Sequence, residues 1–371
     1  MDSSKITGGK DITVTICESL RGLEELRGHW NDLLAGASCG TVFLTWDWLY
    51  TWAERFLKEQ RRLFLPIVSE GPNVIGIVPM YLDKVSRGPL RVRELAFLGI
   101  PETGSDYLDF ITKKGKEQVV VESLLECLFG RYRKAWDILC LKEIPSGSAI
   151  LTQLLYQLRR SGKHWVIEEG SYCPGVLLPG NFDEYFNRLS SHRRQQYKRE
   201  MKILFSSERV EHVVCRKGQS FEEAYRTFRT LYEQRWGGDY GELFGFLQSY
   251  IERNGNADKA EVSLLMVDGR PVGGLLHLIH GEVMYMYLMA IDKDFNRSIS
   301  IGNLMCGMNL KHAVESGFKE YDFLKGEEFY KLLWMNQAKR AINVSVYNKS
   351  MASLLAYITM SAKGLGKILL R

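Results

Sequence analysis

The stretch of chain that decides the fold of the C-terminal half runs from Val262 to Gly302 and reads VSLLMVDGRPVGGLLHLIHGEVMYMYLMAIDKDFNRSISIG. It holds three short apolar runs, which are 262–267, 271–279 and 282–290. The dipeptides Asp268-Gly269 and His280-Gly281 separate these runs. Short apolar runs joined by tight, glycine-containing turns are typical of an antiparallel meander. We therefore predict a three-stranded meander here.

A polar loop at 292–300 follows the meander and leads directly into an apolar helix expected over 301–316. The first N–H groups of a helix have no partner within the helix, and the helix dipole adds positive potential at the same point. Phosphate groups bind well at such a terminus. The residues expected to hold a pyrophosphate there are Arg297, Ser298, Ser300, Ile301 and Gly302. For Arg297, a solvated loop arginine is the alternative interpretation.

The rest of the chain alternates between strand-like and helix-like segments, which is typical of an α/β fold. In the first half we expect strands at 11–17, 63–68, 74–82, 92–98 and 136–141, and helices at 20–34, 46–58, 116–129 and 149–160. In the second half we expect one long helix from 181 to 204, a strand at 209–215, helices at 221–235 and 240–253, a strand at 320–324, a short helix to 338 and a strand at 341–347. At 371 residues the chain is expected to form two domains, 1–175 and 176–371.

The composition is that of a globular protein. Hydrophobic residues make up 45% and charged residues 25%, which argues against a disordered chain. The net charge of +5 suits an anionic ligand but is too small to indicate nucleic-acid binding. The seven cysteines form no C-x-x-C pair, so we expect reduced thiols and neither a disulfide frame nor a metal site. Because we find no signal-like N-terminal segment and no apolar stretch of about 20 residues, we expect a cytoplasmic protein.

Several motifs resemble those of the GNAT acyltransferases. That superfamily binds the coenzyme A pyrophosphate with Arg/Gln-x-x-Gly-x-Gly/Ala between a strand and a helix, and the matching stretch here is Arg297-Ser-Ile-Ser-Ile-Gly302, with serine for the middle glycine. The resemblance is closer to the FemAB-like, CelD-like branch, through Gly317-Phe-Lys-Glu-Tyr-Asp322-Phe323 and Gly326-Glu-Glu-Phe-Tyr330-Lys331-Leu-Leu-Trp334. In the first half it continues in Phe43-Leu-Thr-Trp-Asp-Trp48 and Gly104-Ser-Asp106-Tyr107-Leu-Asp109. The resemblance thus spans nearly the whole chain.

The resemblance implies two GNAT-like α/β domains in tandem, each with a mixed sheet flanked by helices, as in the FemAB-like architecture. It implies transfer of an acyl group, most simply acetyl, from acyl-CoA to an amine. The amine would belong to a small molecule or to a lipid- or sugar-linked precursor of a polysaccharide or of the cell envelope. Two alternatives stay open: an aminoacyl-tRNA-dependent transferase, against which the modest net charge argues, and a catalytically silent module that binds a glycan or lipid precursor.

Lys331 and Asp322 are the candidate catalytic residues of these motifs. Lys331 would stabilise a tetrahedral oxyanion or hold an acceptor phosphate, and the alternative is a cation on a helix surface. Asp322 would be a general base or a structural hydrogen-bonding residue. His277 alternates with leucines on a predicted strand, a pattern that favours a structural role.

A run of basic residues at 192–202 falls within the long helix expected from 181 to 204. Arg194, Lys198 and Lys202 share one helix face by i,i+4 spacing. The candidate acceptor-binding residues are His192, Arg194 and Lys198 in this run and Asp106 in the first half. A solvated helix face is the alternative for the run, and a turn cap is the alternative for Asp106.

The last segment, 351–371, is expected to form an amphipathic helix. Its apolar residues recur at helical spacing and are Met351, Leu354, Leu355, Ile358, Leu365, Ile368 and Leu369. Lys363, Lys367 and Arg371 share another face. The helix would pack on the C-terminal domain, or it would rest on an anionic membrane near a lipid-linked acceptor.

Overall fold

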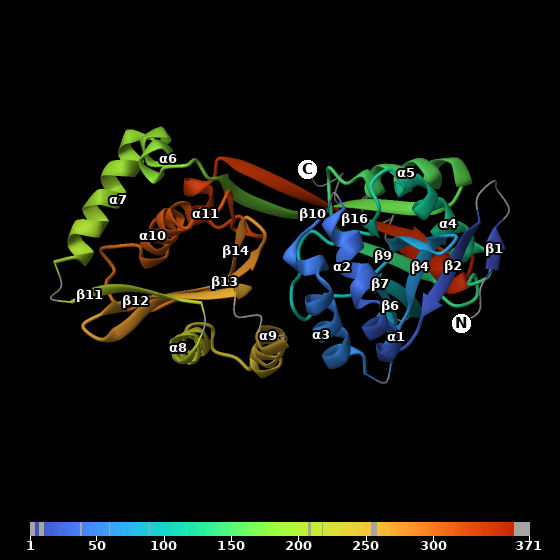
Figure 1. The fold of residues 1–371 in the computed structure, drawn as a ribbon, viewed down its shortest axis with the longest axis horizontal. Coiled ribbons are helices and arrows are strands. Elements are labelled where there is room, and N and C mark those ends of the chain that lie inside the picture. The colour runs from blue at the N-terminus through green and yellow to red at the C-terminus, as the bar shows by residue number, and fades with distance from the viewer. Residues whose placement is uncertain are drawn as a thin grey trace. The chain divides into compact units, whose positions relative to one another are not determined.

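The computed structural model describes residues 4–6, 11–37, 39–58, 60–88, 90–206, 209–216, 218–253 and 258–359. The chain divides into two compact units (Figure 1): unit 1 consists of Met1–Ser171 and Arg340–Arg371, and unit 2 of Tyr172–Lys339. The first division lies close to the expected one at residue 175. Residues 340–359, in contrast, belong to unit 1 and not to the C-terminal domain, because strand β16 (Gln337–Tyr347) pairs with β9 (Ile138–Pro145) in unit 1.

Among the described residues, unit 1 carries two runs of paired strands. One has the order β1-β2-β4-β5-β8 and is formed by β1 (Ser4–Ile6), β2 (Ile12–Cys17), β4 (Leu65–Glu70), β5 (Asn73–Ile77) and β8 (Ile111–Thr112). The other has the order β16-β9-β7-β6-β3 and adds β7 (Leu90–Phe97), β6 (Met80–Arg87) and β3 (Arg62–Leu63). Because β7 and β9 run parallel and β9 and β16 antiparallel, this second sheet is mixed. The helical segments are α1 (Leu20–Glu25), α2 (Arg27–Ala35), η1 (Val42–Leu44), α3 (Trp46–Phe56), α4 (Glu117–Phe129) and α5 (Ala149–Ser161).

Helix α3 supplies much of the core of unit 1. Thr45 caps it by accepting a hydrogen bond from the backbone N–H of Trp48 at 3.4 Å. Trp48 and Trp52, one turn apart, are fully buried. The indole N–H of Trp48 donates to the hydroxyl of Ser105 at 2.9 Å, so the polar edge of this buried ring is satisfied. The same contact attaches the loop that carries Asp106 to the core.

Unit 2 is built on the meander that the sequence predicts. Strands β12 (Ala260–Val267), β13 (Arg270–His280) and β14 (Val283–Ile291) pair antiparallel in chain order, so this prediction is confirmed. The sheet continues on one side with β11 (Val210–Cys215), which pairs with β12. On the other side it continues with β15 (Glu320–Asp322), parallel to β14, and with the end of β10 (His164–Leu177), antiparallel to β15.

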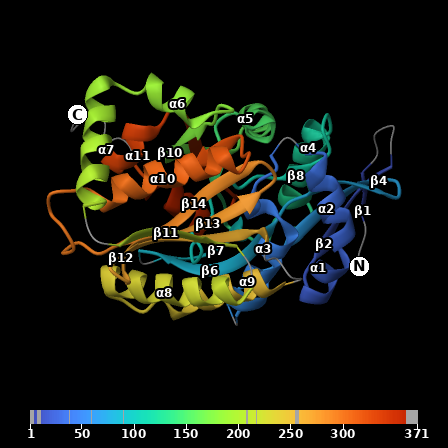
Figure 2. The same ribbon diagram turned by 60° about the vertical axis from the view of Figure 1, so that its left-hand side comes forward.

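Helices cover both faces of this sheet (Figure 2). One face carries α6 (Phe182–Arg188), α7 (Ser191–Leu204), α10 (Ile301–Glu315) and α11 (Phe329–Trp334), and the other carries α8 (Gln219–Trp236) and α9 (Gly241–Glu252). At Gly273 a Cβ would lie 2.9 Å from Ile301 of α10, and at Gly274 a Cβ would lie 2.8 Å from Phe228 of α8. Because neighbouring strand residues point to opposite faces, this glycine pair lets both helices pack directly onto β13.

Some expected elements differ from the observed ones. The single helix expected over 181–204 is wrong, because Leu189 is extended and Ser190 caps a new helix by accepting from the N–H of Arg193 at 3.3 Å. The expected strand 74–82 is split near Pro79, which has no N–H to give to a ladder. Strand β10 was not predicted, because its first residues are half-buried or exposed and show no apolar alternation.

Candidate functional site

Strand β14 leaves its parallel neighbour β15 part-way along the sheet. The two strands pair only up to Tyr285 and Asp322, after which β14 continues to Ile291. On its other edge, the register of β14 with β13 skips Tyr287, which marks a β-bulge. A bulge bends its strand and interrupts the regular ladder of hydrogen bonds. The bulge therefore lies just after the point where the two strands diverge. Residues 287–289 at this point are half-buried.

The loop 292–300 carries the expected donor-binding residues from the end of β14 to the start of α10. The side chain of Asn296 accepts hydrogen bonds from the N–H and the hydroxyl of Ser298, at 2.9 and 2.7 Å. Ser300 is the N-cap of α10, and its hydroxyl accepts from the N–H of Asn303 at 3.4 Å. This capping role explains a serine at the middle position of the loop motif. The next residues stand in the first helical turn, where the helix supplies no acceptor for their N–H groups.

Arg297 lies at the surface of this loop. Its side chain is 87% exposed and pairs with the equally exposed Asp294 at 3.3 Å. Exposed ion pairs of this kind contribute little, so Arg297 can leave Asp294 for an anionic ligand. At Gly302 a Cβ would meet the sulfur of Met289 at 3.4 Å, which is ordinary van der Waals contact. The packing of the protein alone therefore does not require glycine at position 302.

Lys331 is buried, so it is not the solvated helix cation of the alternative interpretation. Its side chain is 5% exposed, and Nζ donates to the carbonyl of Lys325 at 2.7 Å and pairs with Glu328 at 3.0 Å. The backbone at Gly326 lies close to this ammonium group. Gly326 has a φ of 126°, and a Cβ at this position would lie 2.8 Å from Nζ. These contacts engage two of the three N–H bonds of the ammonium. The third can serve a ligand.

Asp322 stands where β14 and β15 diverge, and its carboxylate is already engaged. One oxygen accepts from the N–H of Leu324 at 2.8 Å, and the other lies 3.2 Å from Nζ of Lys339. Burial, and then the negative charges of Asp322 and Glu320, raise the pKa of Tyr285 beside them. A buried carboxylate held by a cation and a backbone N–H fits the structural role better than that of a base.

A buried polar network, which sequence reasoning missed, joins α7 to the start of α10. The guanidinium of Arg193 donates to the side-chain oxygen of Asn303 at 2.5 Å and lies 5.0 Å from the centre of the Trp334 ring. Asn303 also accepts from the indole N–H of Trp334 at 2.8 Å and donates to Glu200 at 3.1 Å. Burial lowers the pKa of Arg193, whose Nε and Nη1 have no hydrogen-bond partner among the described residues. Its place one turn before Tyr197, on the buried stripe of α7, is the signal that could have found it.

The candidate acceptor residues of α7 differ in their exposure. His192 and Lys198 are exposed, whereas the half-buried Arg194 donates to the backbone carbonyls of Asn187 and Leu189. The structure therefore leaves the first two available to a ligand and gives Arg194 a role within the protein. The roles assigned to these side chains stay predictions.

A second buried network lies in the meander, next to β15. Glu261 is fully buried and pairs with Arg216 at 2.6 Å and with His312 at 3.1 Å. Its other oxygen is 3.9 Å from Nδ1 of His277, whose Nε2 lies 2.8 Å from the hydroxyl of Tyr321. Burial lowers the pKa of His277 to about 4, against the opposing effect of the negative Glu261. This arrangement fits the structural role expected for His277.

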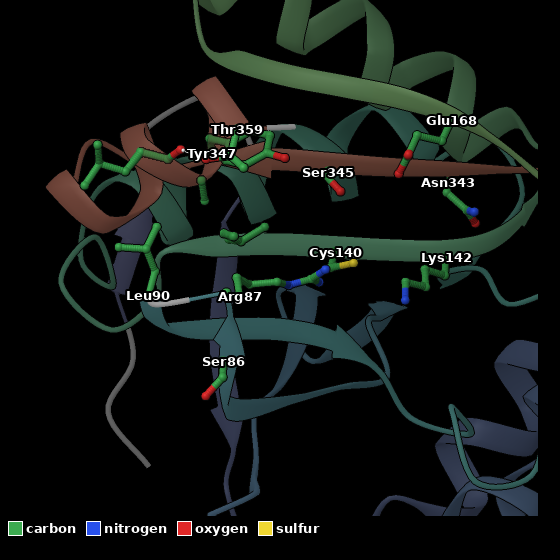
Figure 3. Close-up of a pocket in the computed structure, with 14 residues that line it drawn as sticks. Ser86, Arg87, Leu90, Cys140, Lys142, Glu168, Asn343, Ser345, Tyr347 and Thr359 are labelled. Atoms are coloured by element: carbon green, nitrogen blue, oxygen red, sulfur yellow. Dashed lines mark hydrogen bonds between the residues drawn. The ribbon is translucent and has the colours of Figure 1, made fainter. Parts of the chain in front are cut away.

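Unit 1 contains the candidate residue Asp106 and, away from it, a cavity. Asp106 is buried in the loop between β7 and β8 and is not among the residues that line the cavity. The cavity, of about 560 Å³, lies against β6, β7, β9 and β16 and is bounded by the helical residues 351–359 (Figure 3). Its walls combine polar groups such as Arg87 and Lys142 with apolar ones such as Leu90.

Comparison with known proteins identifies a domain in unit 2. Residues 191–332 match the family described as the acetyltransferase (GNAT) domain. No curated protein matches the sequence. Among solved structures, FemX has a similar fold, with a TM-score of 0.57 and 13% identity over 96% of this chain and 100% of FemX.

Further structures of similar fold match nearly the whole chain. A tandem GNAT protein from the clavulanic acid biosynthesis pathway has a TM-score of 0.52 and 12% identity over 91% of this chain and 99% of its own. The C-terminal domain of a putative lysylphosphatidylglycerol synthetase from Agrobacterium fabrum has a TM-score of 0.52 and 11% identity over 92% of this chain and 97% of its own. At these identities the likeness concerns the fold.

The match to the acetyltransferase (GNAT) domain covers the segment in which β14 and β15 diverge beside the N-terminus of α10. The fold resembles that of FemX and of the tandem GNAT protein over nearly the full length of the chain. The expected α/β fold of tandem GNAT type is thereby confirmed, and the family match at residues 191–332 agrees with the expected resemblance.

Proposed function

We propose that the protein transfers an acyl group, most simply acetyl, from acyl-CoA to an amine. The observation that carries this proposal is the divergence of β14 from β15 directly before the loop 292–300. The pyrophosphate of the donor meets Arg297 and the first-turn N–H groups of α10. The remainder of the donor follows the edge of β14 that β15 leaves after Tyr285.

The chemistry needs stabilisation of one developing charge and removal of one proton. The neutral amine attacks the thioester carbonyl carbon, the carbon–sulfur bond breaks, and the thiolate of coenzyme A leaves and takes up a proton. Lys331, with one N–H not engaged by Lys325 or Glu328, donates to the oxyanion of the tetrahedral intermediate. The proton of the amine leaves through water, because Asp322 is already bound to Lys339.

The acceptor in this proposal is an amine on a polysaccharide or cell-envelope precursor, which is what the family resemblance implies. An anionic group of that precursor would meet the exposed His192 and Lys198 of α7. The same exposed basic residues favour the second candidate, an aminoacyl-tRNA-dependent transferase, in which α7 would contact RNA.

A thermal-shift panel separates these functions. The full chain is heated with acetyl-CoA, with longer acyl-CoA molecules and with bulk tRNA. We expect acyl-CoA to raise the melting temperature, because a ligand that binds the folded state stabilises it. Stabilisation by tRNA alone would support the second candidate, and no stabilisation by any of them would support a catalytically silent module.

Calorimetry with Gly302→Leu locates the donor site. This change fills the space at the start of α10 and should weaken acetyl-CoA binding by at least about tenfold. Gly28→Leu in α2 is the matched control, since a Cβ there meets no atom within 4 Å. Equal affinities for both variants would count against the loop as the donor site.

A further inference from the structure

The helical residues 351–359 attach to unit 1 through small and polar side chains. Ser353 is fully buried, and its hydroxyl donates to the carbonyl of Asp137 at 2.8 Å. The hydroxyl of Ser350, just before the helix, donates to the carboxylate of Asp137 at 2.7 Å. The ring of Tyr357 stacks on His164 with 4.8 Å between ring centres. The inward face of this helix is therefore firmly held.

The outward face carries the large apolar residues. The exposed fractions are 74% for Met351, 42% for Leu354 and 53% for Ile358, whereas Leu355 lines the cavity of unit 1. The three exposed positions follow the i, i+3, i+7 spacing of a single helix face. A helix that only packs on its own domain buries such a stripe, whereas this one buries Ser353 and Ala356 instead.

The sequence on either side of this apolar stripe is basic. The sequence contains no Asp or Glu from Arg340 to its last residue, and in this stretch it carries Arg340, Lys349, Lys363, Lys367 and Arg371. The stack of Tyr357 on His164 places the end of α5 beside the helix, and there Arg159 and Arg160 are exposed. Acidic residues are also absent from 144–167 and resume at Glu168.

We propose that this C-terminal face, defined as the stripe Met351, Leu354 and Ile358 with Lys349, Arg159 and Arg160, binds an anionic lipid bilayer. The apolar side chains enter the boundary between headgroups and acyl chains, and the cations meet the lipid phosphates. A second copy of this chain is a poorer occupant, because a symmetric contact would bring the same cations together. No helix in the described part of the chain is long and apolar enough to cross a bilayer.

Co-sedimentation with vesicles tests this proposal on the full chain, without donor or acceptor, so its result is independent of the proposed enzymatic function. The vesicles contain phosphatidylcholine alone or phosphatidylcholine mixed with phosphatidylglycerol. We expect sedimentation with the anionic vesicles and much less with the neutral ones, and we expect added salt to weaken it.

Variants assign the binding to the C-terminal face. The double variant Leu354→Ser and Ile358→Ser should weaken vesicle binding by at least about tenfold, because it removes two inserted apolar side chains. Arg159→Gln with Arg160→Gln should weaken binding to anionic vesicles by roughly fivefold per residue. Phe205→Ser is the matched control, because it removes an apolar side chain of similar exposure, 54%, from unit 2.

Three outcomes would overturn the proposal. One is that neither vesicle type sediments the protein. Another is that the stripe variants and Phe205→Ser bind alike. The third is a dimer of the free protein, measured by sedimentation velocity, that Leu354→Ser and Ile358→Ser convert to a monomer, since the stripe would then be an interface between copies.

Discussion

Lys331 and Arg297 are both candidate cations of unit 2, and the structure places them in opposite environments. Lys331 is 5% exposed and held by Glu328 and by the carbonyl of Lys325, whereas Arg297 is 87% exposed and faces a single exposed partner. A buried, fixed donor can stabilise a developing charge without reorganising, but an exposed one must be recruited by its ligand. This difference is the reason why we propose catalysis for the first residue and donor binding for the second.

We expect the largest effect from the replacement of Lys331. Lys331→Ala should lower kcat by about 10²–10³-fold and change donor affinity little, because one preorganised donor to the oxyanion is lost. Steady-state kinetics with calorimetry of donor binding checks this. Lys311→Ala, an exposed lysine of α10, is the matched control. A fully active Lys331→Ala variant would show that Lys331 is not catalytic. A variant whose main change is a raised KM for the acceptor would instead support a role of Lys331 in binding an acceptor phosphate.

A pH series tests whether His277 and His212 make the stability of unit 2 depend on pH. Burial lowers the pKa of both His277 and His212 from 6.5 to about 4. Between these values the unfolded chain binds protons that the folded chain does not, so the free energy of unfolding should fall as the pH falls from 6.5 through 4. The loss is on the order of 3 kcal/mol for each histidine.

Urea unfolding at several pH values measures this loss. His277→Gln should flatten the dependence, whereas His192→Gln, which removes an exposed imidazole from α7, is the control and should not. An unchanged slope for His277→Gln would contradict the assignment of this histidine to the pH dependence.

Gly326→Ala should disturb Lys331 without replacing it. The residue has a φ of 126°, and a Cβ there would lie 2.1 Å from the carboxylate of Glu328 and 2.8 Å from Nζ of Lys331. We expect a lower melting temperature, corresponding to about 1–3 kcal/mol of strain, together with a lower kcat. Gly302→Ala is the control for stability, because its Cβ makes an ordinary contact with Met289. Equal melting temperatures for the two variants would contradict the close packing at Gly326.

We expect the smallest effect from the replacement of the exposed Arg297. Arg297→Ala should weaken donor binding by about three- to tenfold and leave kcat nearly unchanged, because an exposed cation in water contributes modestly. The difference from the natural protein should shrink as salt is added, since exposed charges are screened. Calorimetry at low and high ionic strength measures both. A loss of kcat as large as that of Lys331→Ala would remove the contrast between the two cations.

The meander could be predicted because its information is local, with apolar runs and two glycine turns in sequence order. The bulge of β14 could not be predicted in this way, because β14 is apolar or aromatic throughout and no alternation marks its two faces. In the structure, Met284, Met286 and Met289 all contact one apolar cluster, and the spacing of two and then three residues requires an extra residue at Tyr287.

Other features depend on contacts between distant segments, which no local pattern contains. The assignment of residues 340–359 to unit 1 follows from the pairing of Tyr347 with Ile138 and its neighbours. The burial of Arg193 depends on Asn303, which lies more than a hundred positions away. In both cases the sequence predicts the element but not the partner. Residues 360–371 of the expected C-terminal helix lie outside the described residues, so that part of the prediction is untested.

The glycine pair of β13 sets how closely a helix packs on each face of the sheet. Gly273 lets Ile301, the first residue of α10, approach the sheet, and Gly274 lets Phe228 of α8 approach it from the other side. A methyl group at Gly273 would therefore push the start of α10 away from the sheet, whereas the same group at Gly274 would push only α8. Two adjacent backbone positions thus act as separate spacers, and the distance of the N-terminus of α10 from the sheet can be changed at one of them without altering the other layer.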